Sequence, residues 1–321
     1  MLRVEGQWVW DSWWVDDGDR HHLFHLVAPA SLGDPELRHG NARVGHAVSE
    51  DLVTWDSLPD ALVPRPGEWD DQAIWTGCTV RGDDGRWRLF YTALGRERRG
   101  LDQRVGVAFS EDLLTWDRPQ HAPLLSADPR WYRTLDGVGP ASETWRDPFV
   151  FRDPGGDGWH LVLAARDRDG EPGDDGVLGH ARSADLETWE VQPPLTRPGA
   201  GFSQLEVPQI HPLGGRWVLL FSGHPSIQTE ARLAAHATAD VAAYCLWAVV
   251  ADSPLGPWDV SLAQPFTAEP RLFAAPLARR RDGQAVLLGF RHLEEDGVLP
   301  EEITDPIPVG LRGGVLVSLE P

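Results

Sequence analysis

The chain of 321 residues contains no lysine, so all 29 of its basic residues are arginines, against 49 acidic residues. The formal net charge at pH 7 is -20, and a surface with this excess of negative charge repels nucleic acids and anionic membranes. We therefore expect neither a nucleic-acid partner nor a membrane partner. A neutral small molecule is the ligand that this charge favours.

Long apolar runs and helical periodicity are also missing. No hydrophobic run approaches the roughly 18 residues that a membrane-spanning helix needs, and residues 1–6 lack the charged and apolar segments of a secretory leader. We therefore expect a cytoplasmic protein. Only residues 230–243 show a helical pattern, so the chain is predicted to be all-β.

Cysteine is scarce, with Cys78 and Cys245 as the two examples. Their separation matches neither a metal-ligand motif nor a disulfide framework, and we interpret both as packed thiols. The chain has 12 histidines, but His46 and His180 lack ligand spacing and are expected to be turn or strand residues. We therefore expect no metal and no cofactor.

Glycine, proline and tryptophan are abundant, with 33, 27 and 16 residues, which indicates short strands joined by tight turns. A repeat organises them. Residues 44–55, 105–116 and 178–189 read VGHAVSEDLVTW, VGVAFSEDLLTW and LGHARSADLETW, and 248–258 form a degenerate fourth copy. The copies end at tryptophans that are 61, 73 and 69 residues apart, namely Trp55, Trp116, Trp189 and Trp258.

Each copy is typical of a strand, then a Ser-x-Asp-Leu turn whose Ser and Asp bond the local backbone, then a Trp at the start of the next strand. We interpret these tryptophans as packing between structural units rather than stacking on sugars. Hairpin patterns lie between the copies, at residues 9–27, 73–92, 149–164, 207–221 and 273–290. Together they predict one domain over residues 1–321, a five-bladed β-propeller closed by residues 303–309 and 315–319.

The innermost strands of such a propeller are predicted at residues 8–15, 73–80, 145–151, 204–210 and 272–277. Three carboxylates interrupt these apolar strands, Asp11, Asp147 and Glu206, at separations of 136 and 59 residues. Taken alone, the Arg146-Asp147 pair fits a bulged strand end with a structural ion pair. Because buried carboxylates without partners are costly, we expect three at one phase of the repeat to converge on the central channel.

Convergent carboxylates in a concave site are typical of glycoside chemistry, in which one acts as nucleophile and another as acid and base. Partial burial and like charges are expected to raise one pKa, so that this group stays protonated near neutral pH. Three aromatic residues neighbour these strands, and sugar stacking and core packing explain them equally well: Trp10, Trp13 and Trp75.

Three segments, residues 44–64, 75–78 and 89–92, resemble the catalytic domain of glycoside hydrolase family 32, the β-fructofuranosidases, inulinases and levanases. The WDSW segment at residues 10–13 is similar to family 68, the levansucrases, and the WRDP segment at 145–148 is shared by both. The two families form one clan of five-bladed propellers, and the resemblance covers nearly all of this chain.

The resemblance implies that Asp11 is the nucleophile, that Asp147 stabilises the transition state by holding ring hydroxyls, and that Glu206 is the general acid and then the base. It also implies retention at the anomeric carbon. Arg146 is expected to bond sugar oxygens or to hold the carboxylates, since its fork of donors suits either role.

The chain departs from the family 32 pattern at several points. That family has Asn-Asp-Pro where this chain has Trp-Asp-Ser at residues 10–12, a Cys where Val207 follows the acid, and a substrate-binding Gln where Leu26 stands. Family 32 enzymes also carry a C-terminal β-sandwich, for which we expect no residues here. These differences leave open the choice between families 32 and 68 and the fructoside that is cleaved.

The sequence therefore predicts a retaining glycoside hydrolase acting on β-fructofuranosides, namely sucrose, fructooligosaccharides or fructans, with some fructosyl transfer. One alternative is an inverting arabinan- or xylan-type glycosidase on the same fold. Another is a non-catalytic sugar-binding propeller, and a Trp-rich scaffold is the third.

Overall fold

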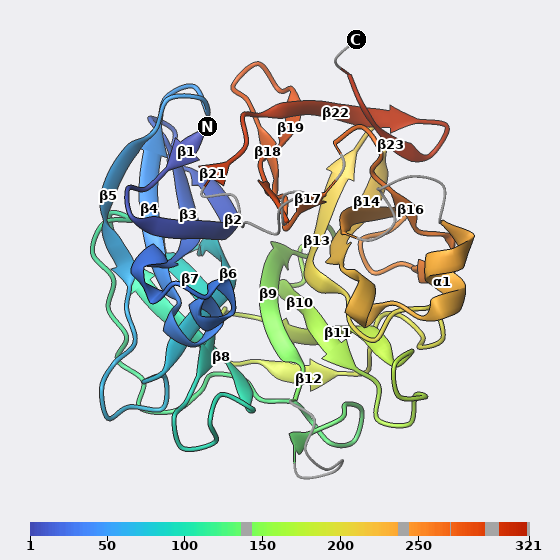
Figure 1. Ribbon diagram of the computed structural model, residues 1–321, viewed down its shortest axis with the longest axis horizontal. Helices are drawn as coiled ribbons and strands as arrows, with labels where there is room; N and C mark the ends of the chain where they lie inside the picture. The colour runs from blue at the N-terminus through green and yellow to red at the C-terminus, as the bar shows by residue number, and fades with distance from the viewer. Residues whose placement is uncertain (136–142, 237–243, 270, 293–301, 320–321) are drawn as a thin grey trace.

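The computed structural model describes residues 1–135, 143–236, 244–269, 271–292 and 302–319. Antiparallel sheets stand around a central axis like the blades of a fan, and the chain passes from one blade to the next in sequence order (Figure 1). This is a five-bladed β-propeller, so the predicted fold class is confirmed. Within the described residues no β-sandwich follows the propeller.

Blade 1 consists of β2 (Gln7–Asp16), β3 (His21–Pro29), β4 (Arg43–Ser49) and β5 (Asp56–Leu62). Blade 2 has the three strands β6 (Ala73–Arg81), β7 (Trp87–Leu94) and β8 (Gln103–Ser110). Blade 3 consists of β9 (Trp145–Arg152), β10 (Trp159–Arg166), β11 (Gly176–Ser183) and β12 (Glu190–Gln192). In each blade the first strand is innermost, as predicted (Figure 1).

Blade 4 consists of β13 (Glu206–Leu213), β14 (Arg216–Gly223), β15 (Cys245–Ala251) and β16 (Gln264–Pro265). Blade 5 is formed by β18 (Leu277–Arg279), β19 (Ala285–Leu287), β22 (Ile307–Arg312) and β23 (Val315–Ser318), and its inner hairpin continues as β17 (Leu272–Phe273) and β20 (Phe290–Arg291). The ring is closed by β1 (Leu2–Arg3), which pairs with β21 (Glu302–Ile303). The predicted C-terminal strands are thus present, and the N-terminal strand β1 completes the closure.

Helices contribute little to the fold. The described α-helix is α1 (Glu230–Ala235), whose first turn is capped by the Thr229 hydroxyl accepting from the Arg232 N–H; the rest of its predicted span, residues 237–243, lies outside the described residues. A 3-10 segment, η2 (Pro35–Asn41), joins β3 to β4. In the part of the chain that the structure describes, no helix combines the length and apolar character that crossing a bilayer requires.

The repeated Ser-x-Asp-Leu segments form the same turn in three blades. In each, the Ser hydroxyl accepts a 2.8 Å hydrogen bond from the Leu N–H, and the Asp carboxylate accepts two more from the residues that follow. The leucine takes a left-handed conformation in every copy, with φ of 64°, 64° and 66° at Leu52, Leu113 and Leu186. These buried side chains and saturated backbone bonds offset a conformational cost of about 1–2 kcal/mol.

The repeat tryptophans pack between blades, as predicted. Trp116 of blade 2 lies edge-on to Phe24 of blade 1, with ring centres 5.7 Å apart, and Trp189 of blade 3 meets Phe90 of blade 2 at 5.6 Å. Trp55 packs against a core cluster that includes blade 5, and Trp258 is buried in the cluster shared by blades 3 and 4.

His46 and His180 lie in strands, as expected. His46 shares a 2.9 Å hydrogen bond with His22, which bonds Asp17 at 3.0 Å. The equivalent chain in blade 3 is formed by Asp153, His160 and His180. The two cysteines are buried free thiols, and burial raises the pKa of each to about 12.

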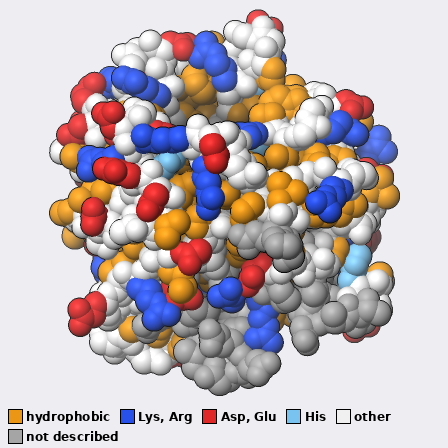
Figure 2. All heavy atoms as spheres, turned by 90° about the horizontal axis from the view of Figure 1, so that it is seen from above, with side chains coloured by type: hydrophobic (Ala, Val, Ile, Leu, Met, Phe, Trp, Pro, Cys, Tyr) orange, Lys and Arg blue, Asp and Glu red, His pale blue; other side chains and the backbone are white. Residues whose placement is uncertain are grey.

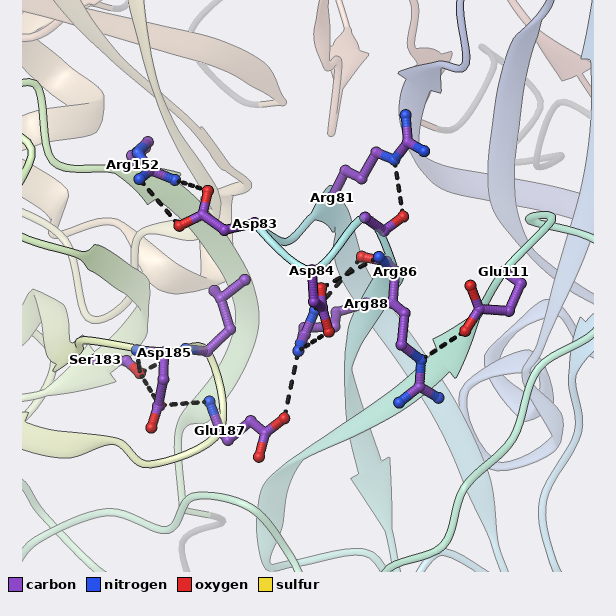
Figure 3. Close-up of polar contacts among 12 residues, drawn as sticks. Arg81, Asp83, Asp84, Arg86, Arg88, Glu111, Arg152, Ser183, Asp185 and Glu187 are labelled. Carbon is purple, nitrogen blue, oxygen red and sulfur yellow. Dashed lines mark hydrogen bonds and ion pairs between the residues drawn. The ribbon is translucent and has the colours of Figure 1, made fainter.

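An arginine network joins blades 2 and 3 at the turn between β6 and β7 (Figure 3). Arg88 of β7 is 2% exposed, donates to both carboxylate oxygens of Asp84 at 2.8 and 3.0 Å, and reaches Glu187 of blade 3 at 3.4 Å. Nearby, Arg152 pairs with Asp83. The ring edge in Figure 2 likewise mixes arginine with acidic side chains.

We expect Arg88→Met to lower the free energy of unfolding by roughly 1–2 kcal/mol, because a buried guanidinium with three charge-assisted bonds is lost while the more exposed carboxylates rehydrate. Arg86→Met is the matched control. Its partner pair with Glu111 is 42% and 74% exposed, and its loss is expected to cost less than about 0.5 kcal/mol. Urea denaturation of both variants measures the difference, and equal effects would contradict the inter-blade role of Arg88.

Candidate active site

The innermost strands are interrupted by β-bulges at equivalent places. The ladder shifts register at Asp11 in β2, at Thr76 in β6, after Arg146 in β9 and after Glu206 in β13. Backbone φ is positive at Asp11, Asp147 and Val207, with values of 31°, 62° and 48°. A bulge bends the strand and redirects its side chains, so each inner strand presents different residues above and below this point.

The local sequences suit these bulges. Pro148 and Pro208 follow the positive-φ residues Asp147 and Val207, and a proline lacks the N–H that the interrupted ladder no longer uses. The positive φ of a non-glycine residue costs on the order of 1–3 kcal/mol. Strain of this size at three neighbouring positions is the pattern expected of a functional site.

The three predicted carboxylates line one funnel of about 600 Å³. Their phase differs from the prediction, however. Asp11 and Asp147 occupy the bulge position, whereas Glu206 lies one residue before it, in the place that Trp10, Trp75 and Arg146 hold in the other blades. The prediction that all three carboxylates occupy one equivalent position of the repeat was therefore wrong for Glu206, because a bulge changes which strand position faces the channel.

Two of the three predicted aromatic residues, Trp10 and Trp75, line the funnel. Trp13 does not. It lies beyond the bulge, beside a second and mostly apolar cavity of about 390 Å³ that contains neither Asp11 nor Glu206. Its indole N–H donates to Thr79 at 3.1 Å and its ring stacks on Phe24 at 5.9 Å, so of the two interpretations left open for Trp13, core packing is the one that these contacts support.

Arg146 ties two of the carboxylates together across neighbouring blades. Its Nη2 donates to Glu206 Oε1 at 2.5 Å, and its Nε lies 3.4 Å from Asp147 Oδ2. The side chains of Arg146, Asp147 and Glu206 are only 11%, 5% and 16% exposed. Burial by itself lowers the pKa of Arg146, but the charges of Glu206 and Asp147 outweigh it and hold that pKa above its usual range.

Asp147 is anchored by the backbone as well. Its N–H donates to Thr92 Oγ1 at 2.8 Å, and its Oδ2 accepts from the Val207 N–H at 3.1 Å. Burial raises the pKa of Asp147 to about 6, with the neighbouring Arg146 opposing the rise. Asp147 is thus held by groups from three blades, and its carboxylate contacts Arg146 and Val207.

Among the described residues, Asp11 has a single hydrogen-bond donor, the hydroxyl of Thr76, at 2.7 Å from its Oδ2. Burial raises the pKa of Asp11 to about 7, and the negative charges of Asp147 and Glu206 contribute in the same direction. The sequence predicted that one carboxyl would be shifted into the neutral range. The structure assigns the largest rise to Asp11, the residue implied to be the nucleophile.

Several funnel residues were missed from the sequence. Thr76 shares the bulge position with Asp11, and a search for that position in each inner strand would have found it. The others come from connections between strands and carry no periodic signal: Arg38, His39, Gln204, His224, Tyr244 and His292. Among the described residues, no group of three or more His, Cys, Asp or Glu side chains is arranged to hold a metal ion.

Comparison with known proteins identifies what the chain is similar to. Residues 14–246 match the model of the glycosyl hydrolases family 32 N-terminal domain, a range that includes Asp147 and Glu206. Beta-fructofuranosidase 1 of Zea mays is 30% identical over 199 residues, which is 60% of this chain and 27% of that protein. The sucrose-6-phosphate hydrolase of Escherichia coli is 28% identical over 222 residues, 65% of this chain and 41% of that protein. The chain thus matches less than half the length of these two relatives.

Solved structures with the same fold include the kestose-bound inulosucrase of Halalkalicoccus jeotgali, with a TM-score of 0.78, 23% identity and coverage of 99% of this chain and 88% of that one. The levansucrase of Bacillus subtilis has a TM-score of 0.74 at 16% identity and covers 100% and 88%. At these identities the likeness establishes the fold.

Asp11→Asn is expected to stabilise the protein. With a folded-state pKa of about 7 against an ordinary 3.8, the folded protein binds more protons than the unfolded chain between these values, so stability falls as the pH rises through that window. Removing the charge should raise the free energy of unfolding on the order of 2–4 kcal/mol at pH 8 and about half as much at pH 5.

Urea denaturation at the two pH values measures this gain. Asp112→Asn is the control, because backbone hydrogen bonds to its turn carboxylate hold the pKa of Asp112 below its usual range, and its substitution should destabilise at both pH values. A stability of Asp11→Asn at or below that of the unsubstituted protein at pH 8 would contradict the buried, strained state of Asp11.

Proposed function

The chain belongs to glycosyl hydrolase family 32, and from this premise we propose that it is a retaining glycoside hydrolase that cleaves β-fructofuranosides such as sucrose, fructooligosaccharides or fructans, with some fructosyl transfer to acceptors other than water. The observation that carries the proposal is the buried cluster of Asp11, Asp147 and Glu206 in one funnel, bridged by Arg146. Titratable groups with strongly shifted pKa values in a concave site are typical of catalysis.

In the proposed reaction, an Asp11 carboxylate oxygen attacks the anomeric carbon while the bond from that carbon to the leaving-group oxygen breaks. Glu206 gives its proton to that oxygen. Glu206 then takes a proton from water, the water oxygen bonds to the anomeric carbon, and the ester to Asp11 breaks. Two displacements at the same carbon give net retention.

Asp147 and Arg146 are proposed to position the furanose ring. The Asp147 side chain is 5% exposed and is held by backbone and guanidinium donors, where a fixed negative charge stabilises the positive charge that develops on the sugar. Arg146 remains charged at all relevant pH values. Its ion pair keeps Glu206 beside the glycosidic bond that is cleaved. This division of roles leaves the chemistry to Asp11 and Glu206.

The reactive form has Asp11 ionised and the proton on Glu206. A pKa of about 7 at Asp11 therefore limits the population of reactive enzyme at mildly acidic pH. The same desolvation makes the ionised carboxylate a stronger nucleophile.

The remaining sequence-based expectations stay proposals. We place the protein in the cytoplasm, which is supported by two buried free thiols, and we treat residues 1–321 as one domain because blades 1 and 5 join through β1 and β21. A neutral carbohydrate is the proposed ligand. A sugar-binding propeller without catalysis is disfavoured, because simple binding does not require a carboxyl group whose pKa burial raises to about 7 beside two further carboxylates.

Asp11→Asn is expected to reduce sucrose turnover by at least about 10³-fold, because the amide cannot form the ester. Glu206→Gln should have a comparable effect on sucrose but a much smaller one on an aryl β-fructofuranoside, whose leaving group needs no proton. Initial rates on both substrates separate the two roles. NMR of the first product should show β-fructofuranose, and release of the α-anomer would favour the inverting alternative.

The pH profile of kcat/KM for sucrose is expected to rise through a limb near pH 7, since Asp11 must be ionised. Thr76→Val should move this limb upward by roughly 0.5–1 pH unit, because the hydroxyl hydrogen bond favours the carboxylate. Thr79→Val, which removes a hydroxyl beyond the bulge, is the control and should leave the limb in place. A limb unaffected by Thr76→Val would mean that another group controls it.

A further inference from the structure

The second, mostly apolar cavity, of about 390 Å³, takes no part in the proposed reaction. It lies between the innermost strands of all five blades, since residues of β2, β6, β9, β13 and β18 line it, and we call it the axial cavity. Three residues, Thr76, Asp147 and Val207, line both this cavity and the funnel. The axial cavity therefore lies behind the bulges of the candidate active site. Its volume is in the range of about 300–1,000 Å³ that is typical of small-molecule sites.

Aromatic side chains form part of the wall of the axial cavity, namely Trp13, Trp14 and Phe149. The Trp13 indole N–H donates to Thr79. The Trp14 indole N–H donates to Leu277 O at 3.0 Å, and the Trp14 side chain is half-buried. Because both N–H groups are bonded within the protein, the two indoles offer a ligand only their ring carbons. Another planar aromatic ring packs well on such a wall.

A histidine supplies the polar feature of the cavity, and its tautomer is fixed by Gln209. The Gln209 Oε1 accepts from the Leu277 N–H at 3.3 Å, and its Nε2 donates to Ala275 O at 3.4 Å. The orientation of the Gln209 amide is therefore set by the backbone. His211 Nε2 lies 3.1 Å from Gln209 Oε1. Since that oxygen can only accept, His211 Nε2 carries the proton and donates it to this bond.

The other ring nitrogen, His211 Nδ1, faces no partner. Burial, and then the positive charge of Arg279, lower the pKa of His211 to about 3, so the ring is neutral and Nδ1 is an acceptor. No described residue donates to Nδ1, and this atom, in a half-buried side chain, keeps accessible surface. The ring also meets Phe149 edge-on, with ring centres 5.0 Å apart. An aromatic wall and an open acceptor are thus adjacent in the axial cavity.

The charged side chains that line the cavity are already bonded to the protein. They are Asp16, Asp147 and Arg279. Asp16 accepts from the Gly18 N–H at 2.7 Å, Asp147 pairs with Arg146, and Arg279 donates to two backbone carbonyls. A charged ligand would find no free counter-charge among these groups, so the chemistry of the cavity favours a neutral one.

We propose that the axial cavity is a binding site for a neutral, planar aromatic molecule that carries one N–H or O–H donor, such as an indole or a phenol. The ring of the ligand packs on the aromatic wall, and its donor bonds His211 Nδ1. The site is separate from the funnel and does not depend on the proposed function. A ligand held there contacts the bulged strands from the side opposite to the funnel.

The test compares the binding of indole and of 1-methylindole by titration calorimetry, because the two probes share their rings and differ in the N–H donor. Indole is expected to bind with a Kd on the order of 0.1–1 mM, and about 5–10-fold more tightly than 1-methylindole, since one hydrogen bond is lost. In His211→Phe the two probes should bind equally. This comparison in the unsubstituted protein tests the donor even if a variant fails to fold.

A matched pair of tryptophans tests the location. Trp14 lines the axial cavity and Trp75 lines the funnel, and both are half-buried on innermost strands. Trp14→Leu is expected to weaken the binding of both probes by about 5–10-fold, whereas Trp75→Leu should leave both Kd values within twofold. Absence of indole binding, equal affinities of the two probes in the unsubstituted protein, or a loss confined to Trp75→Leu would each overturn the site. Sucrose hydrolysis is not the readout, so failure of the proposed function leaves this test intact.

Discussion

The β-bulge in the innermost strands is the constraint on which the site depends. A regular strand alternates its side chains between two faces, and five such strands around an axis would fill the channel with apolar residues. At Asp11, Thr76 and Asp147 the bulge turns the backbone so that polar side chains meet at the axis. Its positive φ values are tolerated because the surrounding blades are rigid: their turns are saturated with hydrogen bonds and their seams are filled by the repeat tryptophans.

Gathering three carboxylates around one funnel is unfavourable, and Arg146 offsets only part of the cost. It lies against Glu206 and Asp147, whereas Asp11 depends on one hydroxyl. The uneven compensation separates the groups chemically, because the pKa of Asp11 rises furthest. A proton shared among neighbouring carboxyl groups with different environments is what acid and base chemistry at one carbon requires. The cost of the site to the free energy of unfolding is offset by the apolar cores between blades and by ion pairs such as that of Arg88.

The blade count was predictable because the Ser-x-Asp-Leu-x-Thr-Trp turn is a local structure whose residues recur where a blade ends. Asp11, Asp147 and Glu206 stood out as charges in apolar strands. The offset of Glu206 and the placement of Trp13 beyond the bulge were not predictable from spacing, since a bulge inserts a residue without changing the apolar pattern around it. Arg38 and His292 lie in connections, where neither periodicity nor burial is encoded locally, and only the assembled ring brings them to the funnel.

The central claim, that Asp11 carries the sugar between two displacements, is tested most directly by trapping the covalent intermediate. Glu206→Gln, incubated briefly with an aryl β-fructofuranoside and digested under acid conditions, should yield a peptide containing Asp11 that is heavier by one fructosyl group in its mass spectrum. The adduct should be absent from Glu206→Gln that also carries Asp11→Asn. An adduct on another residue, or complete turnover with no adduct and release of the inverted anomer, would contradict the account.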